Sequence, residues 1–261
     1  KNKYFMIREY IKLIKFRYHL SFVSVILGAL FFGKTFDFTL IISLAFVYIS
    51  LNLFLYTGLY TLNDIFDRKA DMLHPQKKNR PIASGRISLG NGLVFAFACL
   101  FSGLIFGFYL GRQIFYIYLL FIILNLFYSL IAKKIPYLEL LGNSLTHVLR
   151  FYLGAALVAS VAPTQVLIGI LLIALGTSVE RRIVEMKSEH NNSRKVLRYY
   201  TLNKLYFLEA LFFAGLIILA TADFVNNSLI YTLLTLYFLI FVFFINRSKK
   251  FGFIFKKIWL K

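Results

Sequence analysis

Apolar stretches long enough to cross a bilayer recur along the whole chain, separated by shorter and more basic segments. The hydrocarbon core of a bilayer is about 30 Å thick, and a helix needs roughly 20 apolar residues to span it. Eight such segments can be traced, at residues 19–33, 39–62, 91–110, 114–132, 140–161, 163–179, 203–222 and 228–245. With 59% hydrophobic residues in 261, the composition is also that of a membrane protein. We therefore predict an all-α, polytopic membrane helical bundle with eight transmembrane helices.

The net charge of +19 follows the loops of this predicted topology. Of the 30 Lys and Arg, 27 lie at the two ends or in the even-numbered loops, and only Lys34 and Arg112 lie in the opposite loops. Cytoplasmic loops of membrane proteins carry such an excess of basic residues. Both termini and the even loops are therefore expected to face the cytoplasm, in a multi-pass protein of the cell membrane. This placement favours a membrane topology over nucleic-acid binding.

The two ends of the chain differ from the spans. Residues 1–17 are basic and amphipathic and lack the small-residue cleavage site of a signal peptide, which predicts an interfacial helix. Residues 246–261 are too short and too basic to span, which predicts a cytoplasmic tail. No tract indicates a second domain, so residues 1–261 are treated as one transmembrane domain. Cys99 is the single cysteine, which excludes a disulfide framework or a cysteine zinc site within the chain.

Three of the five Asp residues fall within NDIFDRKAD, residues 63–71, at the end of the second span. With about 100° per residue, one helix face carries four polar side chains there: Asn63, Asp64, Asp67 and Asp71. Carboxylates this close repel one another unless a cation offsets them, and their oxygens suit Mg²⁺, which also takes substrate phosphates. These four residues are candidate Mg²⁺ ligands. The alternative is a solvated helix end paired with Arg68 and Lys69.

Basic residues follow at once in HPQKKNRPIASG, residues 74–85. Lys77, Lys78 and Arg80 lie in this loop, which two prolines stiffen. Acids that hold a metal and bases that hold phosphate oxygens together predict a diphosphate site. The catalytic candidates are Asp67, Asp71, Lys77 and Arg80. His74 either binds phosphate or makes a hydrogen bond that orders the loop.

These two motifs resemble a known family. NDIFDRKAD is similar to the NDxxDxxxD signature of the UbiA superfamily of intramembrane prenyltransferases, and RPIASG to the motif that follows it. Within that superfamily, HPQKKNRPIASG most resembles the branch of decaprenyl-phosphate phosphoribosyltransferases. The resemblance implies a UbiA-type bundle, in which nine helices are usual, so a ninth helix is left open. It also implies Mg²⁺ as cofactor and a polyprenyl phosphate as acceptor of phosphoribose.

The segment after the sixth span is basic and contains no Asp, whereas aromatic UbiA prenyltransferases carry a second Asp-rich motif at this place. Glu185 and Glu189 have the spacing of such a motif, but Glu185 can pair with Arg181 or Arg182 one turn back. The segment instead resembles the KRxxEL...RxxLxxYT stretch of the phosphoribosyltransferase branch. The expected substrate-binding residues are Lys78, Tyr128, Lys133, Arg150, Arg181, Arg182, Glu185, Arg194 and Tyr200.

Arg150 lies within the fifth span, where a charged residue is a functional candidate by default. It either faces an anionic headgroup, together with His147, or snorkels, or pairs with Glu139 or another buried acid. The chemistry expected overall is transfer of phosphoribose from phosphoribosyl diphosphate to a polyprenyl phosphate, with release of pyrophosphate. Prenyl transfer to an aromatic or glycerol-phosphate acceptor is the alternative. A transporter with an acidic ion site is a third reading, although transport sites tend to lie near the bilayer midplane. The expected partners are a polyprenyl lipid, a diphosphate donor and the bilayer, with no nucleic acid; the oligomeric state is open.

Overall fold

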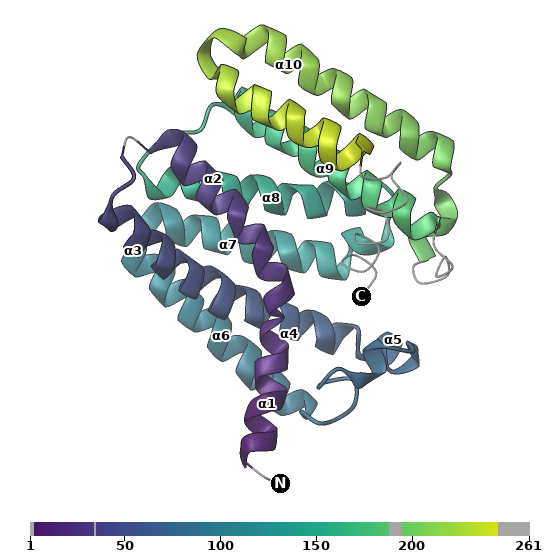
Figure 1. Ribbon diagram of the computed structural model, residues 1–261. Helices are drawn as coiled ribbons and strands as arrows, with labels where there is room; N and C mark the ends of the chain where they lie inside the picture. The colour runs from purple at the N-terminus through teal and green to yellow at the C-terminus, as the bar shows by residue number, and fades with distance from the viewer. Residues whose placement is uncertain (1–2, 34, 188–194, 245–261) are drawn as a thin grey trace. The chain divides into compact units, whose positions relative to one another are not determined.

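In a computed structural model of the chain, which describes residues 3–33, 35–187 and 195–244, every regular element is helical (Figure 1). The predicted all-α fold is confirmed. Within these ranges, five helical runs are long and apolar enough to cross a membrane: Tyr4–Phe32, Phe38–Phe66, Leu89–Leu110, Arg112–Lys134 and Leu202–Asp223. A shorter apolar helix covers Asn227–Phe243. The two helices nearest the predicted fifth and sixth spans carry several charged side chains. The count of eight spans therefore stays a prediction.

The described chain forms two compact units, and the first comprises Lys1–Leu130 and Leu153–Ser160. Its elements are α1 (Lys3–Ile14), η1 (Phe16–Phe22), α2 (Val23–Phe32), α3 (Phe38–Val47), η2 (Tyr48–Tyr56), α4 (Thr57–Phe66), α5 (Arg68–Leu73), η3 (Lys77–Asn79), α6 (Leu89–Leu110) and α7 (Arg112–Leu130). The π-helical η2 joins α3 to α4 without a break, so one long helical run leads to the NDIFDRKAD motif. The predicted second span is thus confirmed as a helix, with a π-helical middle.

The second unit comprises Ile131–Tyr152 and Val161–Lys261. Its elements are η4 (Ala132–Lys134), α8 (Leu138–Leu157, whose last residues belong to the first unit), α9 (Thr164–Met186), η5 (Lys195–Tyr199), α10 (Leu202–Tyr237) and η6 (Phe238–Phe244). α9 continues beyond residue 179, where the predicted sixth span ends, so Arg181, Arg182 and Glu185 lie in the same helix. Asp223 and Asn227 leave the helical region inside α10, and the chain folds back there (Figure 1), between the predicted seventh and eighth spans.

Local sequence signals explain where these helices begin and end. All four prolines lie outside the α-helices, as expected because proline lacks an N–H and obstructs a helix interior. Asp37 precedes α3 and its Oδ1 accepts a hydrogen bond from the Leu40 N–H at 2.9 Å. The Ser88 hydroxyl accepts from the Asn91 N–H at the start of α6. Such N-caps satisfy N–H groups that the helix itself leaves unpaired.

Glycines allow α4 and η2 to pack closely on α6. A Cβ at Gly58 would lie 2.7 Å from both the Ala96 carbonyl oxygen and Leu100 Cγ, and one at Gly103 would lie 3.0 Å from the Leu55 nitrogen. Helices in a bilayer gain little from apolar transfer, so close backbone approach between small residues is a main source of their association. This contact fixes α4, the helix that carries Asn63 and Asp64.

We therefore expect Gly58→Ala to lower the stability of the protein. The added methyl group overlaps Ala96 and Leu100, and overpacking of this kind destabilises by about 1–3 kcal/mol. Thermal unfolding of the detergent-solubilised protein should show a lower midpoint. Gly90→Ala is the matched control, because nothing lies within 4 Å of a Cβ at Gly90. Equal shifts in the two variants would contradict the packing argument.

Candidate active site

The NDIFDRKAD segment spans the junction between α4 and α5. Asp67 ends α4 with φ −88° and ψ 0°. The sequence predicted one uninterrupted helix from Asn63 to Asp71, and that prediction is wrong because the helix is interrupted at Asp67. The junction is nevertheless tight, because the Asp67 N–H donates to the Asn63 carbonyl at 2.9 Å and the Asp71 N–H donates to the Asp67 carbonyl at 2.8 Å. The side chains of Asp64 and Asp71 consequently still approach the same partner.

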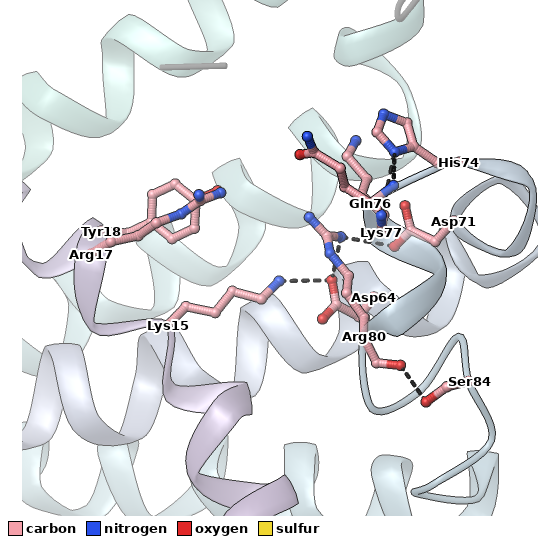
Figure 2. A network of polar contacts seen from close by, with 10 residues as sticks. All are labelled: Lys15, Arg17, Tyr18, Asp64, Asp71, His74, Gln76, Lys77, Arg80 and Ser84. Atoms are coloured by element: carbon pink, nitrogen blue, oxygen red, sulfur yellow. Dashed lines mark hydrogen bonds and ion pairs between the residues drawn. The ribbon is translucent and has the colours of Figure 1, made fainter. Parts of the chain in front are cut away.

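That partner is Arg80, from the HPQKKNRPIASG loop (Figure 2). Arg80 Nη1 donates to Asp64 Oδ1 and to Asp71 Oδ2, each at 2.8 Å. Asp64 and Asp71 are 1% and 3% exposed, so both carboxylates are buried. A buried carboxylate needs a paired cation or several hydrogen bonds to remain ionised. The acidic motif and the basic loop therefore lie in contact with each other within the first unit, as the sequence predicted.

Burial and charge oppose each other in the pKa values of this cluster. Burial raises the pKa of Asp71 above its ordinary value, although Arg80 and Lys77 favour the ionised form. Burial acts to lower the pKa of Arg80, but Asp64 and Asp71 outweigh it and the net pKa is raised. Arg80 therefore stays protonated. A cation of this kind suits binding to the phosphate oxygens of a substrate.

The basic loop is held in place by its own hydrogen bonds. His74 Nδ1 accepts from the Gln76 and Lys77 N–H groups at 3.2 and 3.3 Å, so the loop-ordering alternative for His74 is confirmed. The Ser84 hydroxyl donates to the Arg80 carbonyl at 2.7 Å. Lys77 is half-buried beside this turn, and Lys78 is exposed. The loop thus fixes the backbone of Arg80.

Sequence reasoning missed Lys15. Its Nζ donates to Asp64 Oδ1 at 2.7 Å (Figure 2). The same nitrogen lies 5.0 Å from the centre of the Tyr60 ring. Lys15 adopts φ 53° and ψ 51° between α1 and η1, a left-handed conformation that non-glycine residues seldom adopt. The sequence predicts an interfacial helix over residues 1–17, in which Lys15 is one of six basic residues before the first span and carries no distinguishing signal.

The cluster fits a divalent cation that shares its ligands with a substrate. Among the described residues no three His, Cys, Asp or Glu side chains already converge as a metal site. Asp64 Oδ2, however, is buried and has no hydrogen-bond partner, so one carboxylate oxygen is available beside the ion pairs. Mg²⁺ commonly takes one or two protein carboxylates and completes its shell with water and phosphate oxygens. Asn63 and Asp67, the other two predicted ligands in this part of the motif, lie on either side of Asp64 in the sequence.

A cleft of about 370 Å³ also lies in the first unit, but it is lined by residues around the start of α3 and the end of α8, such as Asp37 and Ser160. None of the predicted site residues lines it. The start of α3 and the acidic motif lie at opposite ends of the helical run Phe38–Phe66. A helix rises by about 1.5 Å per residue, so the two ends of this run are far apart. The charged cluster and this cleft are therefore separate features of the first unit.

The second unit contains a separate charged network around Glu139. Arg182 Nε and Nη2 donate to the two Glu139 carboxylate oxygens, each at 2.6 Å, and Arg182 Nη1 also pairs with Glu185. The Tyr200 hydroxyl donates to Glu139 at 3.2 Å and accepts from the Tyr137 N–H at 2.8 Å. Burial raises the pKa of Tyr200, so the hydroxyl remains a donor. All four side chains of the network are buried.

This network shows where several predicted substrate-binding residues lie. Glu185 pairs with Arg182 and also with Arg181, at 3.4 Å, as the sequence allowed. Arg181 is 33% exposed and is thus more accessible than Arg182. Arg150 is 1% exposed, which excludes snorkelling. Its Nη1 donates to the Thr146 carbonyl and hydroxyl, each at 3.1 Å. Both carboxylate oxygens of Glu139 bind Arg182. These contacts do not test a role in substrate binding.

Three further predicted residues are less constrained by the structure. Tyr128, near the end of α7, and Lys133, in η4, are half-buried and belong to different units. Arg194 lies outside the described residues, as does Glu189, the second acid of the spacing noted in the sequence. Their substrate-binding roles stay predictions.

Fold and charged cluster together define a class: an α-helical membrane protein with a buried acidic and basic site suited to a metal-bound phosphate group. The UbiA prenyltransferase family model matches residues 21–252, and the chain belongs to this family. This is a family of prenyltransferases, which supports a transferase activity.

Solved structures agree with this fold. A UbiA homologue from Archaeoglobus fulgidus bound to GPP and Mg²⁺ is 20% identical, with 97% of this chain and 95% of that chain covered and a TM-score of 0.74. A digeranylgeranylglyceryl phosphate synthase is 19% identical, with 98% and 93% covered and a TM-score of 0.68. An uncharacterised protein of Sinorhizobium fredii, y4nM, is 29% identical over 138 residues, which are 53% of this chain but only 26% of that protein.

We expect Glu139→Gln to destabilise the second unit strongly. The substitution removes the Glu139 carboxylate from Arg182 and leaves Glu185 as its buried acidic partner. Breaking one side of a buried ion pair typically costs about 3–5 kcal/mol. The midpoint of thermal unfolding should fall far more than for Arg198→Gln, a change at an exposed residue of the following segment. A small effect of Glu139→Gln, equal to that of the control, would show that the network contributes little.

Proposed function

We propose that the protein is a Mg²⁺-dependent intramembrane transferase that cleaves a diphosphate donor and releases pyrophosphate. The observation that carries this proposal is the contact of two buried carboxylates, Asp64 and Asp71, with the cations Arg80 and Lys15. Carboxylates of this kind suit a metal, and the adjoining cations suit phosphate oxygens. Two solved UbiA homologues of the same fold carry GPP or DMAPP together with Mg²⁺, which supports the metal.

The residues divide into two roles. Asn63, Asp64, Asp67 and Asp71 would hold Mg²⁺, which would neutralise charge on the diphosphate. Lys77, Arg80 and Lys15 would bind phosphate oxygens and stabilise the departing pyrophosphate. Positively charged groups aimed at the leaving phosphates are the main protein contribution to reactions of this type.

For the donor we propose phosphoribosyl diphosphate, with a polyprenyl phosphate as acceptor. The bond between ribose C1 and the diphosphate breaks, pyrophosphate leaves with the electron pair, and an acceptor phosphate oxygen forms the new bond to C1. A phosphate monoester is largely ionised at neutral pH, so no general base is required. The HPQKKNRPIASG loop supports this donor. So do the bases at the end of α9, since phosphoribosyl diphosphate has a second anionic end, the 5-phosphate.

The remaining predicted residues would serve that second anionic end or the lipid phosphate. The candidates are Lys78, Tyr128, Lys133, Arg150, Arg181, Arg182, Glu185, Arg194 and Tyr200. The distribution of basic loops supports an active site that faces the cytoplasm, in the cell membrane.

Prenyl transfer is the second candidate. The same metal site would ionise an allylic diphosphate, and an aromatic or glycerol-phosphate acceptor would capture the carbon. The solved homologues with bound GPP and DMAPP favour it, and so does the likeness to a digeranylgeranylglyceryl phosphate synthase. The Asp-free segment after α9 favours the phosphoribosyl donor instead.

A direct assay distinguishes the two donors. Purified protein in lipid nanodiscs with Mg²⁺ would receive labelled phosphoribosyl diphosphate and a polyprenyl phosphate, or labelled GPP with hydroxybenzoate or glycerol phosphate. We expect labelled phosphoribosyl lipid and unreacted GPP, because each extra charge-assisted hydrogen bond to the 5-phosphate contributes about 1.5–3 kcal/mol. Prenylated acceptor without ribose transfer would establish the second candidate.

The metal assignment has its own test. Asp67→Asn and Asp71→Asn each remove a carboxylate charge while nearly keeping its shape, so the Mg²⁺ concentration for half-maximal rate should rise by about tenfold or more. Asp37→Asn is the matched control, since Asp37 caps α3 and lies outside the cluster. A wild-type rate for Asp67→Asn at limiting Mg²⁺ would show that Asp67 is not a ligand.

A further inference from the structure

Lys15 occupies an unusual place in the charged cluster, because it comes from a different part of the chain than the other members. Its ammonium group shares Asp64 Oδ1 with Arg80 Nη1, at 2.7 and 2.8 Å (Figure 2). Arg80 also binds Asp71. Two protein cations therefore face two protein carboxylates, and the charges of these four groups sum to zero. A divalent cation approaching Asp64 meets a site whose negative charge the chain has already offset.

The surrounding structure holds Lys15 in this position. Its left-handed backbone separates α1 from η1, and its ammonium group lies between Asp64 and the ring of Tyr60, one turn earlier on α4. Tyr18 stacks on Tyr60, with ring centres 5.0 Å apart. The Lys15 side chain is only 13% exposed. The contact is thus enclosed by aromatic rings and is weakly screened by water.

One apolar cluster anchors both cations that bind Asp64. Leu13, two residues before Lys15, packs with Ile82 and Ile87, which follow Arg80 in the chain, and all three are at most 1% exposed. Arg86 adds an ion pair from the same loop to Glu9 of α1, at 2.7 Å. The N-terminal helix is consequently fixed to the phosphate-binding loop. Lys15 therefore belongs to the same rigid assembly as Arg80.

We infer that Lys15 makes metal binding depend on the donor. With Lys15 on Asp64, the cluster has little net charge and attracts a divalent cation weakly. A bound diphosphate adds negative charge that Lys15 and Arg80 can contact, and the buried Asp64 Oδ2 then supplies a carboxylate oxygen to the metal. Metal and diphosphate bind cooperatively as a result, and each raises the affinity of the other by the same factor. Coupling of this kind limits metal binding in the absence of substrate.

This inference rests on the metal site of the proposed function but not on which diphosphate is the donor. It predicts opposite effects of neutralising Lys15. Affinity for the metal alone rises, because a positive charge beside Asp64 is lost, whereas affinity for the diphosphate falls, because a phosphate partner is lost. A lysine with a purely structural role would give losses of both affinities.

The experiment uses Mn²⁺ and inorganic pyrophosphate as probes, with the full chain in lipid nanodiscs. Mn²⁺ binding without any phosphate compound is followed by electron paramagnetic resonance, and labelled pyrophosphate binding is measured at saturating Mn²⁺. Lys15→Met should bind Mn²⁺ about tenfold more tightly and pyrophosphate about tenfold more weakly than the wild type. Lys15→Arg keeps the charge and should resemble the wild type.

Lys12→Met is the matched control, since Lys12 lies in α1 and pairs with Glu9 outside the site. Lys15→Gln is a second neutral variant in case Lys15→Met does not fold. Unchanged or weaker Mn²⁺ binding by a folded neutral variant overturns the inference. If the wild type binds neither Mn²⁺ nor pyrophosphate under any condition, the proposed metal site itself is wrong. Cooperative binding of the two probes together with transfer from GPP would overturn only the donor assignment.

Discussion

Pairing of buried charges is the constraint on which the rest of this structure depends. A carboxylate or guanidinium in the interior of a membrane helix bundle cannot be solvated by water, so it needs an opposite charge or hydrogen bonds within the protein. Buried Glu9 meets this requirement with Lys12 and Arg86. Two larger networks within the described ranges meet it as well, with Asp64 and Asp71 on Arg80 and Lys15 in one unit, and with Glu139 and Glu185 on Arg182 in the other. Each network draws its partners from segments distant in sequence, so each also fixes how helices and loops meet within its unit.

The two networks differ in what they leave available for chemistry. In the first unit one oxygen of Asp64 has no hydrogen-bond partner, and Arg80 is only half-buried. In the second, Glu139 uses both carboxylate oxygens on Arg182, and Tyr200 adds a further bond. The first arrangement suits ligands that exchange, such as a metal and a phosphate. The second suits a permanent connection that holds the end of α9 and presents the more exposed Arg181.

Departures from regular α-helix accompany the residues of the candidate site in the first unit. The π-helical η2 lies upstream of the acidic motif, Asp67 interrupts the helix between its two neighbouring carboxylates, and Lys15 stands in a left-handed conformation. Irregular backbone is tolerated at membrane depth only where protein covers it. Here the close packing of Gly58 on α6, the approach of η2 to Gly103 of α6, and the apolar cluster around Leu13 provide that cover.

The sequence by itself determined the class of the protein. Long apolar segments force a helical membrane fold because only helices satisfy every backbone hydrogen bond in lipid within one segment. The NDIFDRKAD and HPQKKNRPIASG motifs indicated the family and the acids and bases of the candidate site. Only the tertiary structure decided which charges meet. Lys15 joins Asp64 across 49 positions and Glu139 joins Arg182 across 43, and no local periodicity encodes such pairs. Ion pairing depends on distances of a few ångströms, which are set by how the helices pack and not by spacing along the chain.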